Sequence, residues 1–258
     1  RLANPDRHIV PTLRGAGYET VLCGVEHLAA HGPNQEDAVG YDRVLPAPSS
    51  RASDVAPAVA AYLRERHGRP FFASVGLMET HIPFPDPQPD RFPAEDPRYC
   101  QVPRLLPDDP RIREMAAGFR ASARRMDDGW GHILDALEAA GLADDTLVFC
   151  FSDHGLQFAR HMCNLTDHGL AVYFVARGPG GFTGGKVVDA TVSLLDLFPT
   201  ACEAAGARLP DWLRGRPLGP LVRGETDRLH EAVFGEVTYH AAYEPQRAVR
   251  TGRHKYIR

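Results

Sequence analysis

The residues that most suggest chemistry are an adjacent aspartate and histidine, Asp153 and His154, in the stretch FSDHG at the end of the apolar run TLVFCF. A carboxylate and an imidazole are both good ligands for a divalent cation. A hard ion such as calcium prefers oxygen ligands, and a single histidine is compatible with it but unusual. The alternative is an aspartate that caps a turn beside an exposed histidine, so spacing alone leaves both interpretations open.

Two further histidines follow apolar runs in the same way. ETVLCG leads to His27, and FFASVGLM leads to His81. Each of these histidines, taken alone, is also typical of an ordinary loop. If the runs are parallel neighbouring strands, however, their loops share the carboxyl edge of one sheet, which is where such sheets bind ligands. The recurrence therefore favours a polar site at that edge.

The elements that would position these residues alternate along the chain. Nine prolines between residues 79 and 110 exclude a helix or a central strand there, and long connections of this kind are often functional. We expect Asp54 to cap one helix and Gly141 to end another. The alternation predicts an α/β fold with a mostly parallel central sheet flanked by helices. Strands are expected at 19–24, 71–78, 146–151, 170–176 and 232–237, and helices at 8–17, 54–68, 111–141 and 190–206.

Composition narrows the class of protein and the kinds of partner. The chain has 258 residues, of which 43% are hydrophobic and 24% charged, as in a soluble globular protein of one large or two small domains. A net charge of −4 suggests neither a nucleic-acid partner nor an anionic membrane, and no apolar run approaches the length of a membrane span. The five cysteines have no metal-type spacing, and we expect Cys23 and Cys150 to be buried as small apolar residues.

Six stretches resemble landmarks of the sulfatase family, within the alkaline-phosphatase-like superfamily, and they occur in the family's order. The resemblance covers nearly the whole chain and implies an alkaline-phosphatase-like fold and the hydrolysis of sulfate esters. The stretches are GYETVLCGVEHL, PFFASVGLMETHIPFP, LDALEAAGLADDTLVFCFSDHG, GLAVYFVARGPG, LLDLFPTACEAAG and RAVRTGRHKYI.

The resemblance also implies a mechanism and roles for particular residues. In the family a formylglycine, made from the first residue of a Cys/Ser-x-Pro-x-Arg motif, attacks sulfur, and a calcium ion neutralises the sulfate oxygens as a Lewis acid. Asp153 and His154 match metal ligands, although many relatives have asparagine at the second position. His81 matches the histidine that binds sulfate or protonates the leaving group, and His27 matches the histidine of the family's second signature.

The chain departs from the family pattern in two ways. It contains no Cys/Ser-x-Pro-x-Arg motif, and it lacks the Asp-Asp pair that precedes that motif in the family. We therefore expect residues 1–258 to form a sulfatase-like catalytic domain that is incomplete at its N-terminus and at its C-terminus. The formylglycine would then lie in the missing N-terminal part, and the chain alone would be inactive.

The second departure is the loss of two lysines that would face the sulfate. Val25 and Met162 occupy their positions, and each lost cation is worth about a few kcal/mol. His161 and His168 flank the second gap. We hypothesise that His161 partly replaces the lysine as a contact for the bound anion; the alternative is a histidine in a surface loop.

Three functions therefore remain open. The first is a metal-dependent sulfatase acting on a small-molecule or carbohydrate sulfate ester, with calcium as the expected ion and a periplasmic or secreted location implied by the resemblance. The second is a phosphate or phosphonate ester hydrolase of the same superfamily, because the altered lysines fit a changed substrate anion. The third is a non-catalytic homologue that keeps the fold. Neither the particular substrate nor the oligomeric state can be read from the sequence.

Overall fold

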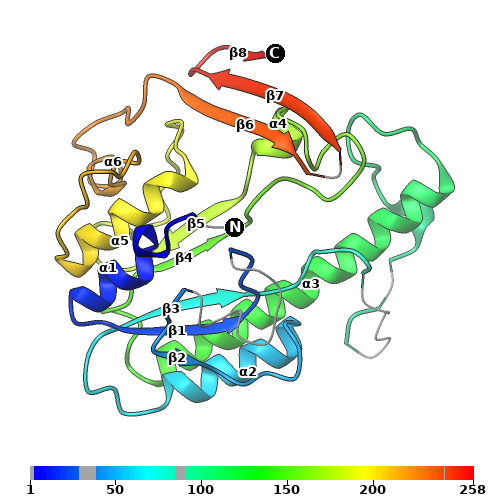
Figure 1. Ribbon diagram of the computed structural model, residues 1–258. Coiled ribbons are helices and arrows are strands. Elements are labelled where there is room, and N and C mark those ends of the chain that lie inside the picture. Colours follow the sequence, from blue (N-terminus) through cyan, green and yellow to red (C-terminus); the bar gives the residue numbers. More distant parts are fainter. Residues whose placement is uncertain (1–2, 29–38, 85–90, 94, 241) are drawn as a thin grey trace. The chain divides into compact units, whose positions relative to one another are not determined.

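The computed structural model describes residues 3–28, 39–84, 91–93, 95–240 and 242–258 (Figure 1). The chain divides into two compact units, Arg1–Ala143 and Asp144–Arg258. The first unit contains a parallel sheet with helices, and the second contains antiparallel strands with shorter helices. Among the described residues, no helix combines the length and the apolar character needed to cross a membrane.

The sheet of the first unit has three parallel strands in the order β2-β1-β3. Strands β1 and β3 pair along their whole lengths, so that their last residues, Gly24 and Gly76, lie opposite each other. A Cβ atom on Gly76 would stand 2.2 Å from the carbonyl oxygen of Val25, so this close pairing requires glycine. The parallel arrangement predicted for these two runs is confirmed. The bounds are β1 Glu19–Gly24, β2 Arg43–Val44 and β3 Phe71–Gly76.

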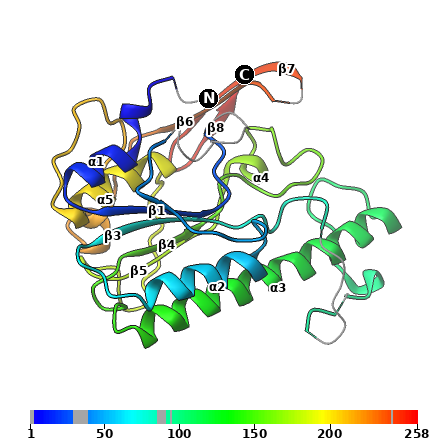
Figure 2. The ribbon, with the colours of Figure 1, turned by 60° about the horizontal axis from the view of Figure 1, so that its bottom comes forward.

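Three α-helices accompany this sheet. Helix α2 packs against β1, β3 and the long helix α3, and Figure 2 shows α2 and α3 running side by side. The two helices approach closely because a Cβ atom on Gly129 of α3 would lie only 2.8 Å from that of Ala52. The bounds are α1 Ile9–Gly15, α2 Ala52–Leu63 and α3 Pro110–Ala139, with short 3₁₀ helices η1 Pro5–Arg7 and η3 Pro97–Tyr99.

The ends of these helices agree only in part with expectation. Helix α3 ends as predicted, since Gly141 follows its last turn with a φ of +69°. The predicted cap at Asp54 is wrong, because α2 begins two residues earlier and Asp54 lies in its first turn, where its carboxylate accepts a hydrogen bond from Ser49. Between residues 79 and 110, the only helix among the described residues is η3, as the prolines indicated.

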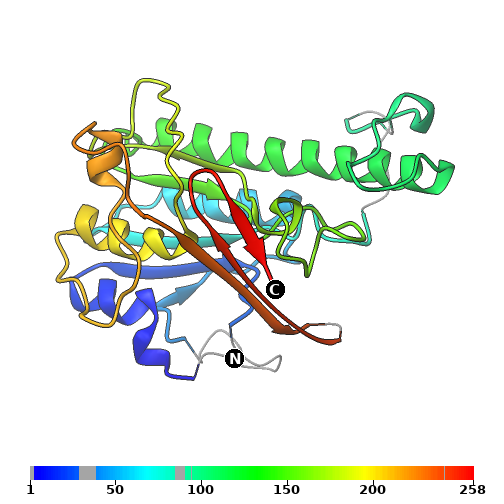
Figure 3. The same cartoon turned by 90° about the horizontal axis from the view of Figure 1, so that it is seen from above.

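The second unit contains an antiparallel pair and an antiparallel three-stranded sheet, the latter seen most clearly in Figure 3. The predicted strands are present, but β4 and β5 pair antiparallel, so the parallel part of the fold is the sheet of the first unit. The strands are β4 Val148–Phe151, β5 Phe174–Arg177, β6 Val233–Tyr239, β7 Tyr243–Arg250 and β8 Lys255–Ile257. The helices are α4 Asp167–Leu170, η4 Leu194–Asp196, α5 Leu197–Ala205 and α6 Gly219–Val222.

The two cysteines expected in the interior differ in burial. Cys23 of β1 is buried, as predicted. The expectation for Cys150 is wrong, because this residue of β4 is only partly buried. Its cross-strand partner Val175 is largely exposed, so this side of the two-stranded pair is the more open one.

A buried carboxylate organises the segment that joins η4, α5 and the chain beyond them. Asp196 has no exposed surface and accepts hydrogen bonds from the amides of Ser193 and Arg216, at 2.8 Å each. The His230 imidazole donates to it at 2.9 Å. These three donors satisfy a charge that would otherwise be costly to bury.

Replacing Asp196 by alanine should lower the free energy of unfolding by about 2–4 kcal/mol, because two backbone amides and an imidazole lose their acceptor. Urea denaturation followed by circular dichroism measures the effect. Asp189→Ala, at an exposed position of the same unit, is the control and should change the free energy by less than about 0.5 kcal/mol. Equal losses for the two variants would contradict the role of Asp196.

Stability should also fall at acid pH because of His8, whose Nδ1 accepts a hydrogen bond from the Val10 amide at the start of α1. Burial lowers the pKa of His8, against the opposing effect of Glu26. The unfolded chain therefore binds the proton more readily, and the stability present above about pH 6.5 is lost as the pH falls through and below that value. Asparagine can cap a helix without titrating, so His8→Asn should flatten this decline in urea denaturation. His132→Asn, at an exposed position of α3, should leave it unchanged.

Candidate functional site

The first group of candidate residues lies at the carboxyl edge of the parallel sheet. His27 follows the end of β1, and His81 follows the end of β3. Because Gly24 and Gly76 are paired, the two loops leave the sheet from the same edge, as the sequence predicted. Both histidines are exposed.

The loop fixes the ring of His81 through its backbone. The His81 amide donates to the carbonyl of Met78 at 2.7 Å, which closes a tight turn. The ring nitrogen Nδ1 lies against the carbonyl oxygen of Ile82. A carbonyl only accepts hydrogen bonds, so Nδ1 carries the proton and Nε2 is the basic nitrogen of the neutral ring.

The second group follows β4 and begins with Asp153 and His154. The Nδ1 atom of His154 lies 2.8 Å from the carbonyl oxygen of Gly155, so here too the basic nitrogen is Nε2. That nitrogen is 3.9 Å from Oδ1 of Asp153, whose side chain is 86% exposed. Two ligands at about 2.4 Å from one ion can lie this far apart, so the pair fits a shared divalent cation.

Asp153 and His154 alone would form only part of a coordination sphere. Among the residues that the structure describes, no group of three or more His, Cys, Asp or Glu side chains could hold a metal ion. Calcium takes six to eight oxygen ligands, so further donors are required beyond Asp153 and His154. The contact of His154 Nδ1 with the Gly155 carbonyl is of the kind that orients metal-binding histidines.

Two glycines hold the loop that follows in a tightly packed form. The Gly155 amide donates to the carbonyl of Gly169 at 2.8 Å. A Cβ atom on Gly155 would lie 1.9 Å from the carbonyl oxygen of His168, and one on Gly169 would lie 2.0 Å from that of Asn164. The backbone on either side of the loop can approach this closely only because neither residue has a side chain.

His161 lies inside this loop and is completely buried. Its relative exposure is 0%, so the alternative of a surface histidine is wrong. Nδ1 is 2.9 Å from the carbonyl oxygen of Ala159, and the ring centre is 4.8 Å from that of His168. Nε2 is buried and has no hydrogen-bond partner among the described residues. A buried nitrogen without a hydrogen-bond partner lowers the stability of the folded state in the absence of a ligand, and such atoms are rare in native structures.

An ion-pair cluster that sequence reasoning missed fixes the end of the same loop. Asp167 of α4 accepts hydrogen bonds from Lys255 of β8 at 2.9 Å and Arg250 of β7 at 3.0 Å. The Lys255 ammonium group, followed by Arg250, lowers the pKa of the Asp167 carboxyl. Asp167 and its partners lie more than eighty residues apart in the sequence, so no local sequence pattern predicts the pairing. The positions of the two missing lysines, Val25 and Met162, are half-buried.

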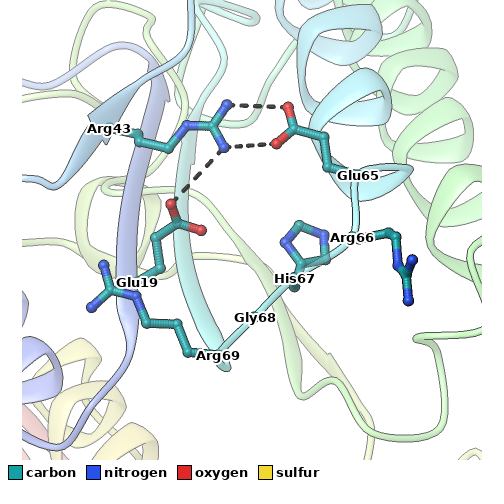
Figure 4. A pocket seen from close by; sticks show the side chains of 7 residues that line it. All are labelled: Glu19, Arg43, Glu65, Arg66, His67, Gly68 and Arg69. Carbon is teal, nitrogen blue, oxygen red and sulfur yellow. Dashed lines mark hydrogen bonds and ion pairs between the residues drawn. The ribbon is translucent and has the colours of Figure 1, made fainter.

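A hollow of about 400 Å³ lies elsewhere, at the amino edge of the parallel sheet (Figure 4). Glu19, the first residue of β1, lines it, so it is at the opposite end of the strand from His27. Within it Arg43 forms an ion pair with Glu65 at 2.8 Å and lies 3.9 Å from Glu19. The hollow is therefore separate from the candidate residues at the carboxyl edge. Its remaining lining residues are Arg66, His67, Gly68 and Arg69.

Comparisons of the sequence point to one family. The pattern of the Sulfatase family matches residues 2–207. The chain is 32% identical over 212 residues to N-sulphoglucosamine sulphohydrolase of Homo sapiens, which covers 70% of this chain and 42% of the relative. It is 30% identical over 200 residues to steryl-sulfatase of Mus musculus, covering 70% and 29%, and 26% identical over 260 residues to an ulvan-active sulfatase of Formosa agariphila, covering 98% and 50%. The chain thus spans at most half the length of these three relatives.

Solved structures show the same fold. A 2-O GAG sulfatase matches with a TM-score of 0.73 and 23% identity, over all of this chain and 65% of that one. The phosphonate monoester hydrolase of Silicibacter pomeroyi matches with a TM-score of 0.74 and 19% identity, over 99% of this chain and 72% of that one. The chain has the alkaline-phosphatase-like α/β fold and belongs to the sulfatase family.

Proposed function

We propose that the protein hydrolyses sulfate esters with the help of a divalent metal ion. The observation that carries the proposal is the Asp153–His154 pair, which follows β4 with a carboxylate oxygen 3.9 Å from a basic imidazole nitrogen. Sulfatases are generally metal-dependent, and this pair occupies a position that matches their metal ligands. A bound ion would act as a Lewis acid that stabilises charge on the ester oxygens.

Calcium is the ion we propose, because a carboxylate is a hard ligand that suits it. His154 is the unusual member of the set. Its Nδ1–H contact with Gly155 orients Nε2 as a ligand, which also fits softer divalent ions. Among the described residues no further His, Cys, Asp or Glu side chain completes a group of three with this pair, so the proposed site needs other oxygen donors such as carbonyls or waters.

His81 and His27 are the proposed catalytic residues of the first unit. In its protonated form His81 can bind a sulfate oxygen through Nε2–H or pass that proton to the leaving oxygen. His27 shares the sheet edge with it and is proposed to bind the same anion. The 258 residues contain no Cys/Ser-x-Pro-x-Arg motif, so none of them is assigned the covalent step that formylglycine performs in the family.

His161 is proposed as a substrate-binding residue in place of the lysine replaced by Met162. Support comes from its buried Nε2, which has no partner among the described residues. Because Nδ1–H is held by the Ala159 carbonyl, Nε2 accepts in the neutral ring and donates only in the imidazolium form.

The proposed substrates are sulfate esters of carbohydrates or small molecules. The named relatives include a sulphoglucosamine enzyme, an ulvan-active enzyme and a steryl-sulfatase. A second candidate, a phosphate or phosphonate ester hydrolase, is favoured by valine and methionine at the two lysine positions, which point to a changed anion. The same valine and methionine also fit a non-catalytic homologue. Measuring the release of sulfate and of phosphate separates these functions.

The intact protein should release inorganic sulfate from an aryl sulfate or a sulfated sugar. His81→Ala should lower kcat/KM by at least about 100-fold, the usual contribution of a general acid. His161→Ala should chiefly raise KM. His132→Ala, at an exposed position of α3, is the matched control and should match wild type.

Three results would change the assignment. Release of phosphate but not sulfate would establish the second candidate. No turnover of either ester would leave a non-catalytic homologue. An unchanged KM and kcat for His161→Ala would remove that residue from the site. Aryl sulfate turnover by the 258-residue chain alone would contradict the view that the nucleophile is not among these residues.

Metal binding by the second unit can be tested with Mn²⁺ as a paramagnetic probe on the 258-residue chain. Broadening of amide NMR signals should be strongest at Ser152 to Gly155, because Asp153 and His154 supply the ligands. Asp153→Asn should abolish that broadening. Asp145→Asn removes an exposed carboxylate just before β4 and should leave it intact. Broadening that persists in Asp153→Asn would exclude Asp153 as a ligand, and competition by Ca²⁺ would test the proposed ion.

A further inference from the structure

Helix α2 begins without a capping side chain of its own. The residue before its first turn, Arg51, has an extended backbone and makes no side-chain hydrogen bond to the helix amides. Four amides at the start of any helix lack partners within the helix, and an acceptor must come from elsewhere. Here the acceptor comes from the loop after β3.

That acceptor is the carboxylate of Glu79, two residues before His81. Its Oε2 atom accepts a hydrogen bond from the Ala52 amide at 2.9 Å. Its Oε1 atom lies 3.8 Å from Nη1 of Arg51, and the Glu79 side chain is only 2% exposed. A buried carboxylate at a helix N-terminus is stabilised by the amide, by the helix dipole and by the guanidinium together.

Two more contacts join the same segments on either side of His81. The Met78 amide donates to the carbonyl of Ser50 at 2.8 Å. The Nη2 atom of Arg51 donates to the carbonyl of Pro83 at 3.3 Å. Residues on both sides of His81 in the chain, at 78–79 and at 83, therefore contact the segment 50–52.

The partner segment is itself closely packed, because it opens a helix with a buried face. Ala52 is buried and lies against Gly129 of α3, where a methyl group would be only 2.8 Å away. Val55 and Val59 continue this buried face. The loop that carries the exposed His81 is thus tied to the start of α2, where buried Ala52 contacts Gly129 of α3.

We propose that Glu79 is a positioning residue for His81, acting through Ala52 and Arg51. It holds the loop after β3 onto the start of α2, so that the His81 imidazole keeps one place at the carboxyl edge of the sheet. The functional part of this inference rests on the proposed role of His81. The positioning itself can be measured on the 258-residue chain without any enzyme assay.

Glu79→Ala and Glu79→Gln separate charge from hydrogen bonding. Alanine removes both, whereas glutamine keeps an oxygen for the Ala52 amide and loses the attraction to Arg51. Amide hydrogen exchange should accelerate at least about tenfold at Ala52 and His81 in Glu79→Ala, since both lose their protection by local opening. Glu79→Gln should restore most of the protection at Ala52. Glu65→Gln, just beyond the C-terminal end of the same helix, is the matched control and should not change either amide.

The second readout is the His81 ring proton signal during titration with sodium sulfate. Wild-type protein should show a saturable shift, Glu79→Ala a shift at least about tenfold weaker in apparent affinity, and Glu79→Gln an intermediate one. Unchanged exchange at His81 in Glu79→Ala would overturn the positioning role. If instead exchange accelerates while sulfate never shifts the wild-type signal, the positioning role stands and the proposed anion contact of His81 fails.

Discussion

The parallel pairing of β1 and β3 is the constraint on which the first unit depends. Because Gly24 and Gly76 end the two strands at the same level, whatever follows them must emerge at one edge. The pairing leaves no room for side chains there, since Gly76 already meets the carbonyl of Val25. His27 and His81 stand three and five residues beyond these glycines, on loops that leave the sheet at that one edge. The position of the candidate residues is thus a consequence of backbone packing, and not a property of the loops alone.

Much of the first unit's fold, and the place of its candidate histidines, could be predicted from local sequence patterns. Apolar runs of strand length, a long amphipathic helix ending at Gly141, and the histidines after two strands all leave signals within about ten residues of sequence. Burial of His161 could not be predicted in this way. A histidine between polar and small residues reads as a surface loop, and it is enclosed only because Gly155 and Gly169 let the loop fold back on itself.

The contacts that hold the loops in place were also beyond sequence reasoning. Asp167 pairs with residues more than eighty positions away, Asp196 with one thirty-four positions away, and Glu79 caps a helix that begins twenty-seven positions earlier. Each acid alone resembles an ordinary surface residue. The energetic reason for its burial or orientation is a partner that only the fold supplies. For the same reason the cap predicted at Asp54 was wrong. The first amide of α2 donates to Glu79, which is distant in sequence, and not to the nearby Asp54.

Three of the candidate histidines share one ring orientation. In His81, His154 and His161 alike, Nδ1 faces a backbone carbonyl, which leaves Nε2 basic in the neutral ring. A basic nitrogen suits a cation and repels an oxyanion, so this orientation in a neutral ring agrees with the metal contact proposed for His154. The proposed contact of His81 or His161 with a sulfate oxygen needs a hydrogen-bond donor at Nε2, which the neutral ring in this orientation does not offer. A lysine carries a donor and a positive charge together, so under the proposed function valine and methionine at positions 25 and 162 leave more of the charge neutralisation to the proposed metal ion.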